Sequence, residues 1–423
     1  MAKEESMRSF LLILGCFVLL GPLAAQADTY GHCRARTIQL HPVNAPLLAP
    51  LMELNSGDQL QFSFDLLGEE EESLSYRIIH CNPNGSPSAV SSFDYLDGFA
   101  SAPVDEVEQS FNTSVSYYHY RVTIPNRDMR IILSGRYRVE AFMRSYPDSL
   151  VASATFFVFE SLAKSNLQEF NRGVSQLHQD YQQLELTLSG SKWQNRPEQV
   201  TVMVVQNYDY RHARYLNQPA EIRAASLVYR SPNKLKFAGG NEFRSFNTNS
   251  IEYAGPRIRE INFYQGRYHY LLHPDADRSF ETYQQRPDIN GRFSVDAERR
   301  GEPDVEADYV YVYFSLPGKP FVAGEQVVIL GQFNQWEPSK EWVLPYDFEE
   351  KAYQRRFLLK QGYYNYTYGL VHPDGTLEKS VFAGSHAQAG NQYQAFVFYR
   401  PFGANYAQLI SVSELGVNVN ELP

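Results

Sequence analysis

Short runs in which apolar and polar residues alternate constrain the fold of this chain more than any other feature of its sequence. In residues 59–66 every second residue is apolar, which is the period of a strand with one buried face, and residues 136–141 repeat the alternation. No segment has a long apolar period of 3.6 residues, and the best helical candidate, residues 164–183, is equally consistent with a polar connection or an edge strand. Further short runs rich in Val, Tyr and Phe resemble strands buried on both faces: residues 200–205, 309–316, 326–330 and 394–399. The sequence therefore predicts an all-β fold with little helix.

The composition of the chain excludes several classes of protein. It contains 30 Tyr and 27 Phe, which favour strands, and 43% hydrophobic with 20% charged residues excludes a disordered chain or a coiled coil. The formal net charge of -10 argues against nucleic acid or anionic lipid as a partner, because binding to either needs clustered basic residues. An outer-membrane β-barrel is a weaker interpretation, since the predicted strands are short and 23 prolines interrupt the chain.

Residues 1–27 have the pattern of a secretory signal peptide. Lys3 and Arg8 lie in a short polar leader, residues 10–20 form an apolar run, and residues 25–27 (AQA) fit a small-x-small cleavage site. The apolar run is too short to span a bilayer. We therefore expect an exported chain in a compartment that permits disulfides.

The chain length and two changes in local composition divide the exported chain into three expected domains. At about 150 residues per domain, a chain of 423 residues is long enough for three hydrophobic cores. Polar sequence after residue 159 and a charged stretch at residues 296–308 mark the boundaries. The expected domains are residues 28–160, 161–298 and 299–423, each of the size of an immunoglobulin-like β-sandwich.

No arrangement of residues for catalysis, metal binding or cofactor binding stands out in the sequence. Motifs of serine hydrolases, zinc proteases and nucleotide-binding proteins are absent, and His80 would point to the opposite face of a strand from Cys81. We therefore expect a protein that is not an enzyme and has no cofactor. Cys33 and Cys81 lack the spacing of zinc ligands. The sequence is consistent with two alternatives: a disulfide between these cysteines, or two unpaired buried thiols.

The C-terminal region resembles the starch- and glycogen-binding immunoglobulin-like modules of the early-set type. Residues 327–336 (VVILGQFNQW) and 358–368 (LLKQGYYNYTY) carry the resemblance. Trp336 matches the first sugar-stacking aromatic residue of these modules, whereas Thr367 and Leu377 stand where a Lys and a second Trp are expected. The resemblance implies a shared fold with a vestigial glycan site at Trp336, and a core or interface role of this aromatic side chain is the alternative.

A series of motifs extends over essentially all of the expected mature chain. In chain order they are residues 36–42 (RTIQLHP), 76–82 (YRIIHCN), 95–99 (YLDGF), 110–113 (SFNT), 117–120 (YYHY), 125–126 (PN), 133–137 (LSGRY), 239–244 (GGNEFR), 288–293 (DINGRF), 306–310 (EADYV) and 360–368 (KQGYYNYTY). Their order and spacing resemble the plug proteins of the type 9 secretion system of Bacteroidota. The chain departs from that family at Asn84 and Gly85, where a Trp usually follows the His-Cys-Asn turn.

The resemblance implies a non-enzymatic periplasmic protein at the inner face of the outer membrane. There it would bind the giant outer-membrane β-barrel translocon of the type 9 secretion system and close its periplasmic opening between export events. The sequence indicates neither a small-molecule ligand nor a transmembrane segment. The candidate partner contacts, which are also candidates for core turns, are Phe93, Tyr95, Phe99, Tyr117, Tyr118 and Tyr120.

Two other interpretations compete with the plug. One is an exported carbohydrate-binding protein that uses the face around Trp336. The other is an undetected hydrolase, which would need a pair of carboxylates in a cleft.

Overall fold

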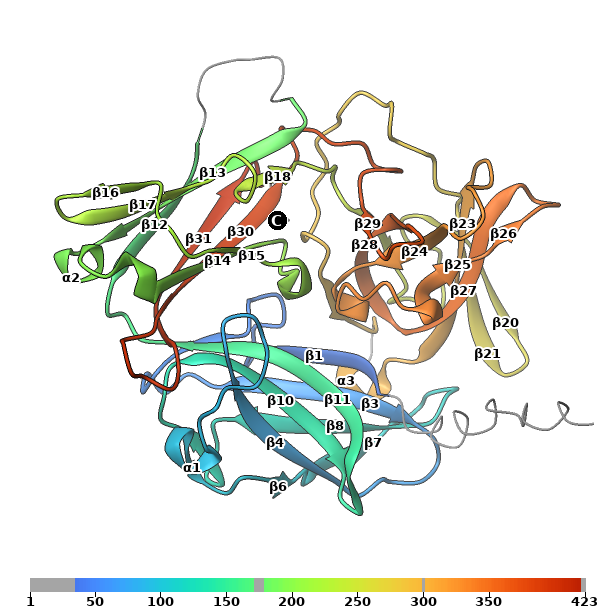
Figure 1. Ribbon diagram of the computed structural model, residues 1–423. Coiled ribbons are helices and arrows are strands. Elements are labelled where there is room, and N and C mark those ends of the chain that lie inside the picture. The colour runs from blue at the N-terminus through green and yellow to red at the C-terminus, as the bar shows by residue number, and fades with distance from the viewer. Residues whose placement is uncertain (1–34, 171–178, 299–300, 420–423) are drawn as a thin grey trace, which may run out of the picture. The chain divides into compact units, whose positions relative to one another are not determined.

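The computed structural model describes residues 35–170, 179–298 and 301–419; the expected signal peptide and Cys33 lie outside these residues. Strands account for 49% of these described residues and helices for 6%, which confirms the predicted all-β fold. In the described residues, no helix is long and apolar enough to cross a membrane. The strands form sheets that pack in pairs into three β-sandwiches (Figure 1).

The first sandwich contains the strands of residues 36–159. One sheet has the order β1 (Arg36–Pro42), β3 (Leu60–Leu67), β8 (Tyr117–Ile124) and β7 (Glu106–Gln109). The facing sheet has the order β2 (Leu51–Glu53), β11 (Tyr146–Phe159), β10 (Gly135–Met143), β4 (Leu74–Cys81) and β6 (Ala102–Pro103). The short helix α1 (Ser92–Tyr95) leads into the paired strands β5 (Leu96–Gly98) and β9 (Met129–Ile131).

Alternation along the strands builds the core of the first sandwich. Leu60, Phe62 and Phe64 on β3 are fully buried, as the sequence predicts, and they pack with Tyr137 and Val139 of β10. Burying one such side chain contributes about 1.5–3 kcal/mol. Because successive side chains of a strand point to opposite faces, the polar residues of β10 project to the outer face of this sheet.

The second sandwich is built from two separate parts of the chain. One sheet has the order β12 (Lys164–Glu169), β13 (Tyr181–Ser189), β17 (Ser226–Arg230) and β16 (Glu221–Arg223), and β18 (Lys236–Ala238) also pairs with β13. The facing sheet has the order β15 (Arg214–Leu216), β14 (Val200–Gln206), β30 (Asn391–Tyr399) and β31 (Gln408–Val417). The short helices α2 (Ser191–Gln194), η2 (Pro197–Gln199) and η3 (Tyr210–His212) lie in its connections. β12 shows that the start of the ambiguous segment 164–183 is an edge strand.

The third sandwich lies between β18 and β30 in the sequence. One sheet has the order β19 (Arg244–Asn247), β28 (Gly362–Val371), β24 (Gln326–Leu330) and β25 (Val343–Leu344), with β22 (Phe293–Val295) and β29 (Leu377–Glu378) also paired to β28. The facing sheet has the order β20 (Ile258–Tyr264), β21 (Arg267–Leu272), β23 (Tyr309–Pro317), β27 (Ala352–Lys360) and β26 (Tyr346–Asp347). The short helices α3 (Pro303–Glu306), η4 (Gln332–Asn334) and η5 (Lys340–Trp342) complete it.

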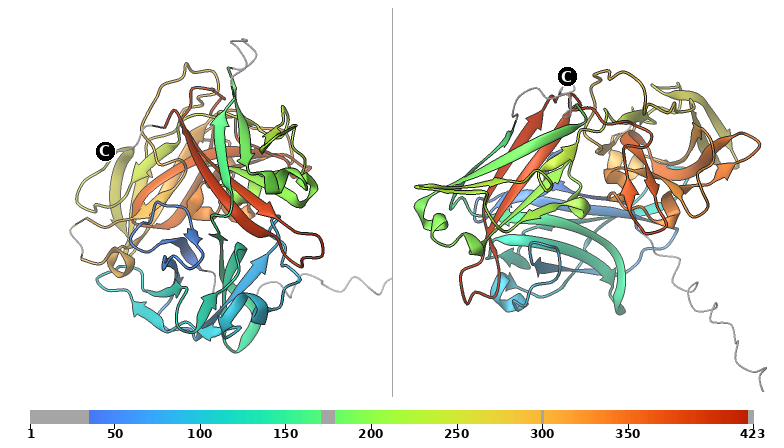
Figure 2. Two further views of the ribbon diagram at one scale, coloured as in Figure 1. Left: turned by 90° about the vertical axis from the view of Figure 1, so that its left-hand side faces the viewer. Right: turned by 45° about the horizontal axis from the view of Figure 1, so that its top comes forward.

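The sheets follow the expected boundary at residue 160 but not the expected boundary at residue 298. β30 pairs with β14 over seven residues, from Val200 opposite Tyr399 to Gln206 opposite Tyr393, so the chain returns to the second sandwich after it has formed the third. Figure 1 shows β30 and β31 in red beside the green strands β12 to β14, and Figure 2 shows the same grouping from two other directions. An apolar run identifies a strand but does not specify its partner strand, which is why the sequence does not reveal this return.

Candidate functional site

Two of the six candidate contact residues are strongly exposed on the first sandwich. Phe93 in α1 is 81% exposed, and Phe99 after β5 is 64% exposed. Tyr95, two residues after Phe93, points inward: it is buried, and its hydroxyl donates a hydrogen bond to the carbonyl of Ile78 at 3.1 Å. The single turn of α1 therefore holds one aromatic ring in the core and presents the other to solvent.

A third exposed aromatic residue comes from the second sandwich. Phe402, in the connection between β30 and β31, is 94% exposed. Tyr406 in the same connection contacts His80 edge-on at 5.6 Å, and the ring of Tyr95 lies 5.7 Å from that of His80. The connection and α1 therefore lie side by side, as Figure 1 also shows. Phe93, Phe99 and Phe402 are exposed rings on two neighbouring sandwiches, and we refer to them together as the exposed aromatic surface.

The tyrosines of residues 117–120 belong mainly to the core. Tyr117 and Tyr120 are fully buried, and Tyr120 stacks on Phe64 with ring centroids 5.3 Å apart. Tyr118 is half-buried, and its hydroxyl lies 3.4 Å from the carbonyl of Glu69. Together with the burial of Tyr95, this fits the alternative of core turns for these residues, and their contact with a partner stays a prediction. Phe93 and Phe99 are the members that remain fully available.

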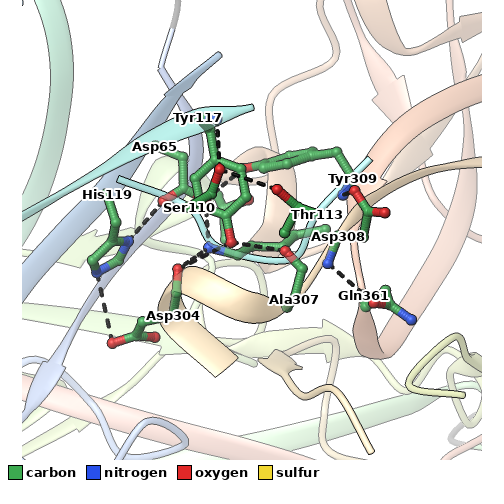
Figure 3. Close-up of polar contacts among 12 residues, drawn as sticks. Asp65, Ser110, Thr113, Tyr117, His119, Asp304, Ala307, Asp308, Tyr309 and Gln361 are labelled. Atoms are coloured by element: carbon green, nitrogen blue, oxygen red, sulfur yellow. Dashed lines mark hydrogen bonds and ion pairs between the residues drawn. The ribbon is translucent and has the colours of Figure 1, made fainter. Parts of the chain in front are cut away.

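A buried group of polar side chains joins the first sandwich to the third (Figure 3). Asp65 on β3 is fully buried, and its carboxylate accepts hydrogen bonds from Lys360 Nζ at 2.7 Å and from the Tyr309 hydroxyl at 2.6 Å. His119 Nδ1 lies 2.7 Å from the other carboxylate oxygen. Asp65 and His119 belong to the first sandwich and Lys360 and Tyr309 to the third, so one buried ion pair crosses the joint.

The electrostatics of this group favour an ionised Asp65. Burial disfavours the charged carboxylate, but Lys360 and His119 outweigh it, and the pKa of Asp65 lies below its ordinary value. Lys360 is 1% exposed; its ammonium also donates to the carbonyl of Asp304 at 2.6 Å and lies 4.3 Å from the centre of the Tyr117 ring. The charges of Asp65 and Lys360 thus compensate each other, and removing either residue would leave the other as an unpaired buried charge.

Contacts around α3 strengthen the same joint. The carboxylate of Asp308 accepts hydrogen bonds from the backbone N–H groups of Ser114 at 2.9 Å and Val115 at 3.2 Å. The hydroxyl of Tyr117 donates to the carbonyl of Ala307 at 2.8 Å, as Figure 3 shows. These bonds hold the loop before β8 against the third sandwich.

An aromatic contact joins the first sandwich to the second. Phe157 on β11 stacks on Phe396 of β30 with ring centroids 4.1 Å apart, and both side chains are fully buried. Met203 and Leu409 of the second sandwich belong to the same apolar cluster. The first sandwich is therefore fixed to its two neighbours by different means, one polar and one apolar.

Trp336 is packed rather than presented to solvent. It is 4% exposed, Phe243 contacts its ring edge-on at 5.8 Å, and Lys379 Nζ lies 4.6 Å from its ring centre. A Cβ atom at Gly291 would lie 2.4 Å from the indole. Because a sugar chain stacks on an open ring face, this arrangement fits the core or interface role of Trp336 rather than an open sugar platform.

Cys81 and His80 are buried neighbours on β4. Cys81 is 2% exposed, and burial raises the pKa of its thiol, which favours the protonated form. Burial lowers the pKa of His80 to about 4, so its imidazole is neutral at pH 7. The disulfide between Cys81 and Cys33 stays a prediction, because Cys33 lies outside the described residues.

The sequence did not single out three residues that the structure makes prominent. Asp65 occupies a polar position of an alternating strand, where solvent is expected, and its burial with Lys360 arises only when the third sandwich packs against it. Phe402 stands between Pro401 and Gly403. Pro and Gly mark turns, which lie at the surface. This flanking pattern could therefore have identified Phe402 as an exposed residue.

A solved structure shares the fold of this chain along nearly its whole length. A crystal structure of a hypothetical protein from Parabacteroides merdae aligns over 90% of this chain and 97% of its own, with 28% identity and a TM-score of 0.86. A second structure, the alkylpurine DNA glycosylase AlkC of Pseudomonas fluorescens bound to DNA containing an abasic site analog, has 13% identity over 30% of each chain and a TM-score of 0.17, which is too low for any argument. No curated protein matches the chain.

The sequence family that matches covers the first sandwich. Residues 35–160 match the family described as type 9 secretion system plug protein 1st domain. The matched range begins one residue before β1 and ends one residue after β11, so it coincides with one complete sandwich. The first sandwich is therefore similar to the first domain of the type 9 secretion plug proteins, which supports a role in type 9 secretion.

Proposed function

We propose that this protein is a non-enzymatic periplasmic plug, exported by its N-terminal signal peptide. It binds the outer-membrane translocon barrel of the type 9 secretion system from the periplasmic side and closes the opening between export events. The match of residues 35–160 to the first domain of the plug proteins carries this proposal.

The contacts that join the sandwiches would make the protein rigid enough to cover a wide opening. A barrel that is wide enough to export folded proteins leaves an aqueous channel, so its cover must resist deformation. The buried pair of Asp65 and Lys360 and the stacked rings of Phe157 and Phe396 fix the first sandwich to the other two. Loss of either joint would expose a buried charge or an apolar surface to water, which opposes movement between the sandwiches.

The exposed aromatic surface suits a contact that can be reversed. Aromatic side chains at the centre of an interface often dominate its binding energy, and Phe93, Phe99 and Phe402 are at least 64% exposed in the free protein. To shift the barrel from almost always closed to almost always open, a competing ligand needs about 5.5 kcal/mol of differential binding. An interface of standard size, about 1,600 Å² in total, can supply affinities of that order.

Site-specific crosslinking in living cells tests the proposal. A photoreactive amino acid replaces Phe402 in one strain and Phe348 in a control strain; Phe348 is 77% exposed but lies after β26 on the third sandwich. We expect Phe402 to crosslink to one very large outer-membrane protein, identified by mass spectrometry, and Phe348 to do so much less. Crosslinks to surface glycans or cargo alone, without an outer-membrane barrel, would contradict the proposal.

A further inference from the structure

A cavity of about 490 Å³ lies where the three sandwiches meet. This volume is within the range of about 300–1,000 Å³ that is typical of small-molecule sites. The side chains that give the cavity its chemistry are Arg136 and Arg138 of the first sandwich, Tyr208, Arg211 and Tyr215 of the second, and Trp336 of the third. In the part of the chain that the structure describes, the lining contains three guanidinium groups and no carboxylate. The wall is therefore basic although the whole chain has a net charge of -10.

Arg136 is the central cation of this cavity. Its side chain projects from the outer face of β10 and the residue is 8% exposed. Nη1 donates to the carbonyl of Pro83 at 2.9 Å and to the hydroxyl of Tyr215 at 3.3 Å. Among the described residues, Nε and Nη2 have no hydrogen-bond partner, and no carboxylate lies within ion-pair distance of the guanidinium.

A buried cation without an anion is unfavourable unless a ligand or water compensates it. The two other arginines differ, because Arg138 pairs with Glu140 at 2.7 Å and Arg211 lies 3.8 Å from Glu337. The unpaired edge of the Arg136 guanidinium, formed by Nε and Nη2, has the spacing that binds the two oxygens of a carboxylate. An anion would therefore bind best at Arg136.

The backbone on both sides of the cavity is strained. Asn207 and Tyr208 have φ angles of 52° and 60°, and Gln335 and Trp336 have φ angles of 53° and 58°. Bulky residues rarely adopt this left-handed conformation, and it persists chiefly where function requires it. In each pair the second residue contributes an aromatic side chain to the cavity wall. Trp336 Nε1 also has no hydrogen-bond partner among the described residues.

We propose that this cavity binds a small ligand that carries a carboxylate beside a ring. Arg136 pairs with the carboxylate, and the half-buried Tyr208 contacts the ring, since aromatic side chains favour contact with flat or ring-shaped groups. A sugar acid and an aromatic amino acid at a peptide C-terminus both have this chemistry. The site is separate from the exposed aromatic surface, so the inference goes beyond the proposed plug and does not depend on it.

Titration calorimetry on the mature chain tests the proposal with two matched pairs of probes. Glucuronate is compared with glucose, and N-acetyltyrosine with its amide. We expect each acid to bind at least about tenfold more tightly than its neutral partner, because a hydrogen bond to a charged group contributes more than a neutral one. The tighter of the two acids distinguishes a sugar acid from a peptide end. Equal affinity within both pairs, or no saturable binding of either acid, would overturn the proposal.

Two variants and a control locate the binding site. Arg136→Gln is expected to lower the affinity for the acid at least about tenfold and to leave the affinity for the neutral probe unchanged, and Arg138→Gln to cause a smaller loss. Arg127→Gln removes the same charge from a side chain that is 89% exposed and outside the cavity, so it should bind as the wild type does. Equal losses in all three variants would contradict the assignment. If Arg136→Gln does not fold, the comparison of acid and neutral probes on the wild type still decides the question.

Discussion

Replacing Lys360 by Met tests whether the joint between the first and third sandwiches depends on one buried ion pair. Lys360 Nζ lies 2.7 Å from the carboxylate of Asp65, and the two residues are 1% and 0% exposed. Met keeps the length and apolar volume of the side chain but removes the charge, so Asp65 would remain buried without its cation. Breaking a buried pair in this way costs about 3–5 kcal/mol, which is a large part of the about 5–15 kcal/mol that stabilises a typical protein.

Urea unfolding at pH 7 of the wild type, Lys360→Met, Asp65→Asn and the double variant measures this cost. Because the double variant leaves no unpaired charge, it should lose less free energy of unfolding than the sum of the two single variants. Arg130→Met is the matched control: it breaks an ion pair with Asp97 whose side chains are 67% and 58% exposed, and it should cost less than about 1 kcal/mol. A similarly small loss for Lys360→Met, or strict additivity in the double variant, would refute the reasoning.

Three further substitutions have expected outcomes. Asp209→Asn should cost about 2 kcal/mol at pH 7, because Lys379 outweighs the effect of burial and lowers the pKa of Asp209 from 3.8 to about 2. In urea unfolding, that cost should be present above pH 4 and should disappear as the pH falls through about 2. Gly291→Ala should lower the melting temperature, because its φ of 78° and a methyl group 2.4 Å from the Trp336 ring are both unfavourable. Phe157→Ala should cost about 3–5 kcal/mol in denaturant unfolding, because it empties a fully buried site between two sandwiches.

The sequence predicts the strands well because their information is local. The alternation in residues 59–66 matches β3 almost residue for residue, and the apolar run at residues 326–330 coincides with β24. Each of these patterns reflects which face of a strand is buried and which is exposed to solvent, and the residues of the strand itself determine this. The all-β fold follows from many such segments together.

The arrangement of the sandwiches depends on contacts between distant residues and is not visible in local patterns. Asp65 and Lys360 are 295 positions apart, and an Asp in an alternating strand has the same sequence signature whether it faces water or another domain. β30 likewise pairs with β14 across the whole third sandwich. Neither pairing leaves a local signal in a single sequence.

The exposure of the candidate contact residues is likewise not visible in local sequence patterns. Phe93 and Tyr95 are two positions apart in an aromatic segment, yet one is 81% exposed and the other 6%. Composition identifies both as aromatic, but only the direction of the turn in α1 decides which ring enters the core. Phe402 contributes to the exposed aromatic surface because β30 and β31 return to the second sandwich, beside α1.

The electrical conductance of the purified translocon barrel in a planar lipid bilayer tests the central claim most directly. The protein is added to the periplasmic side, and the channel current is recorded at constant voltage before and after the addition. Closure predicts a large, saturable fall in conductance that reverses when the protein is washed out, and a weaker effect of a variant in which Phe93, Phe99 and Phe402 are replaced by Ser. An unchanged conductance at protein concentrations that saturate binding to the barrel would contradict the account.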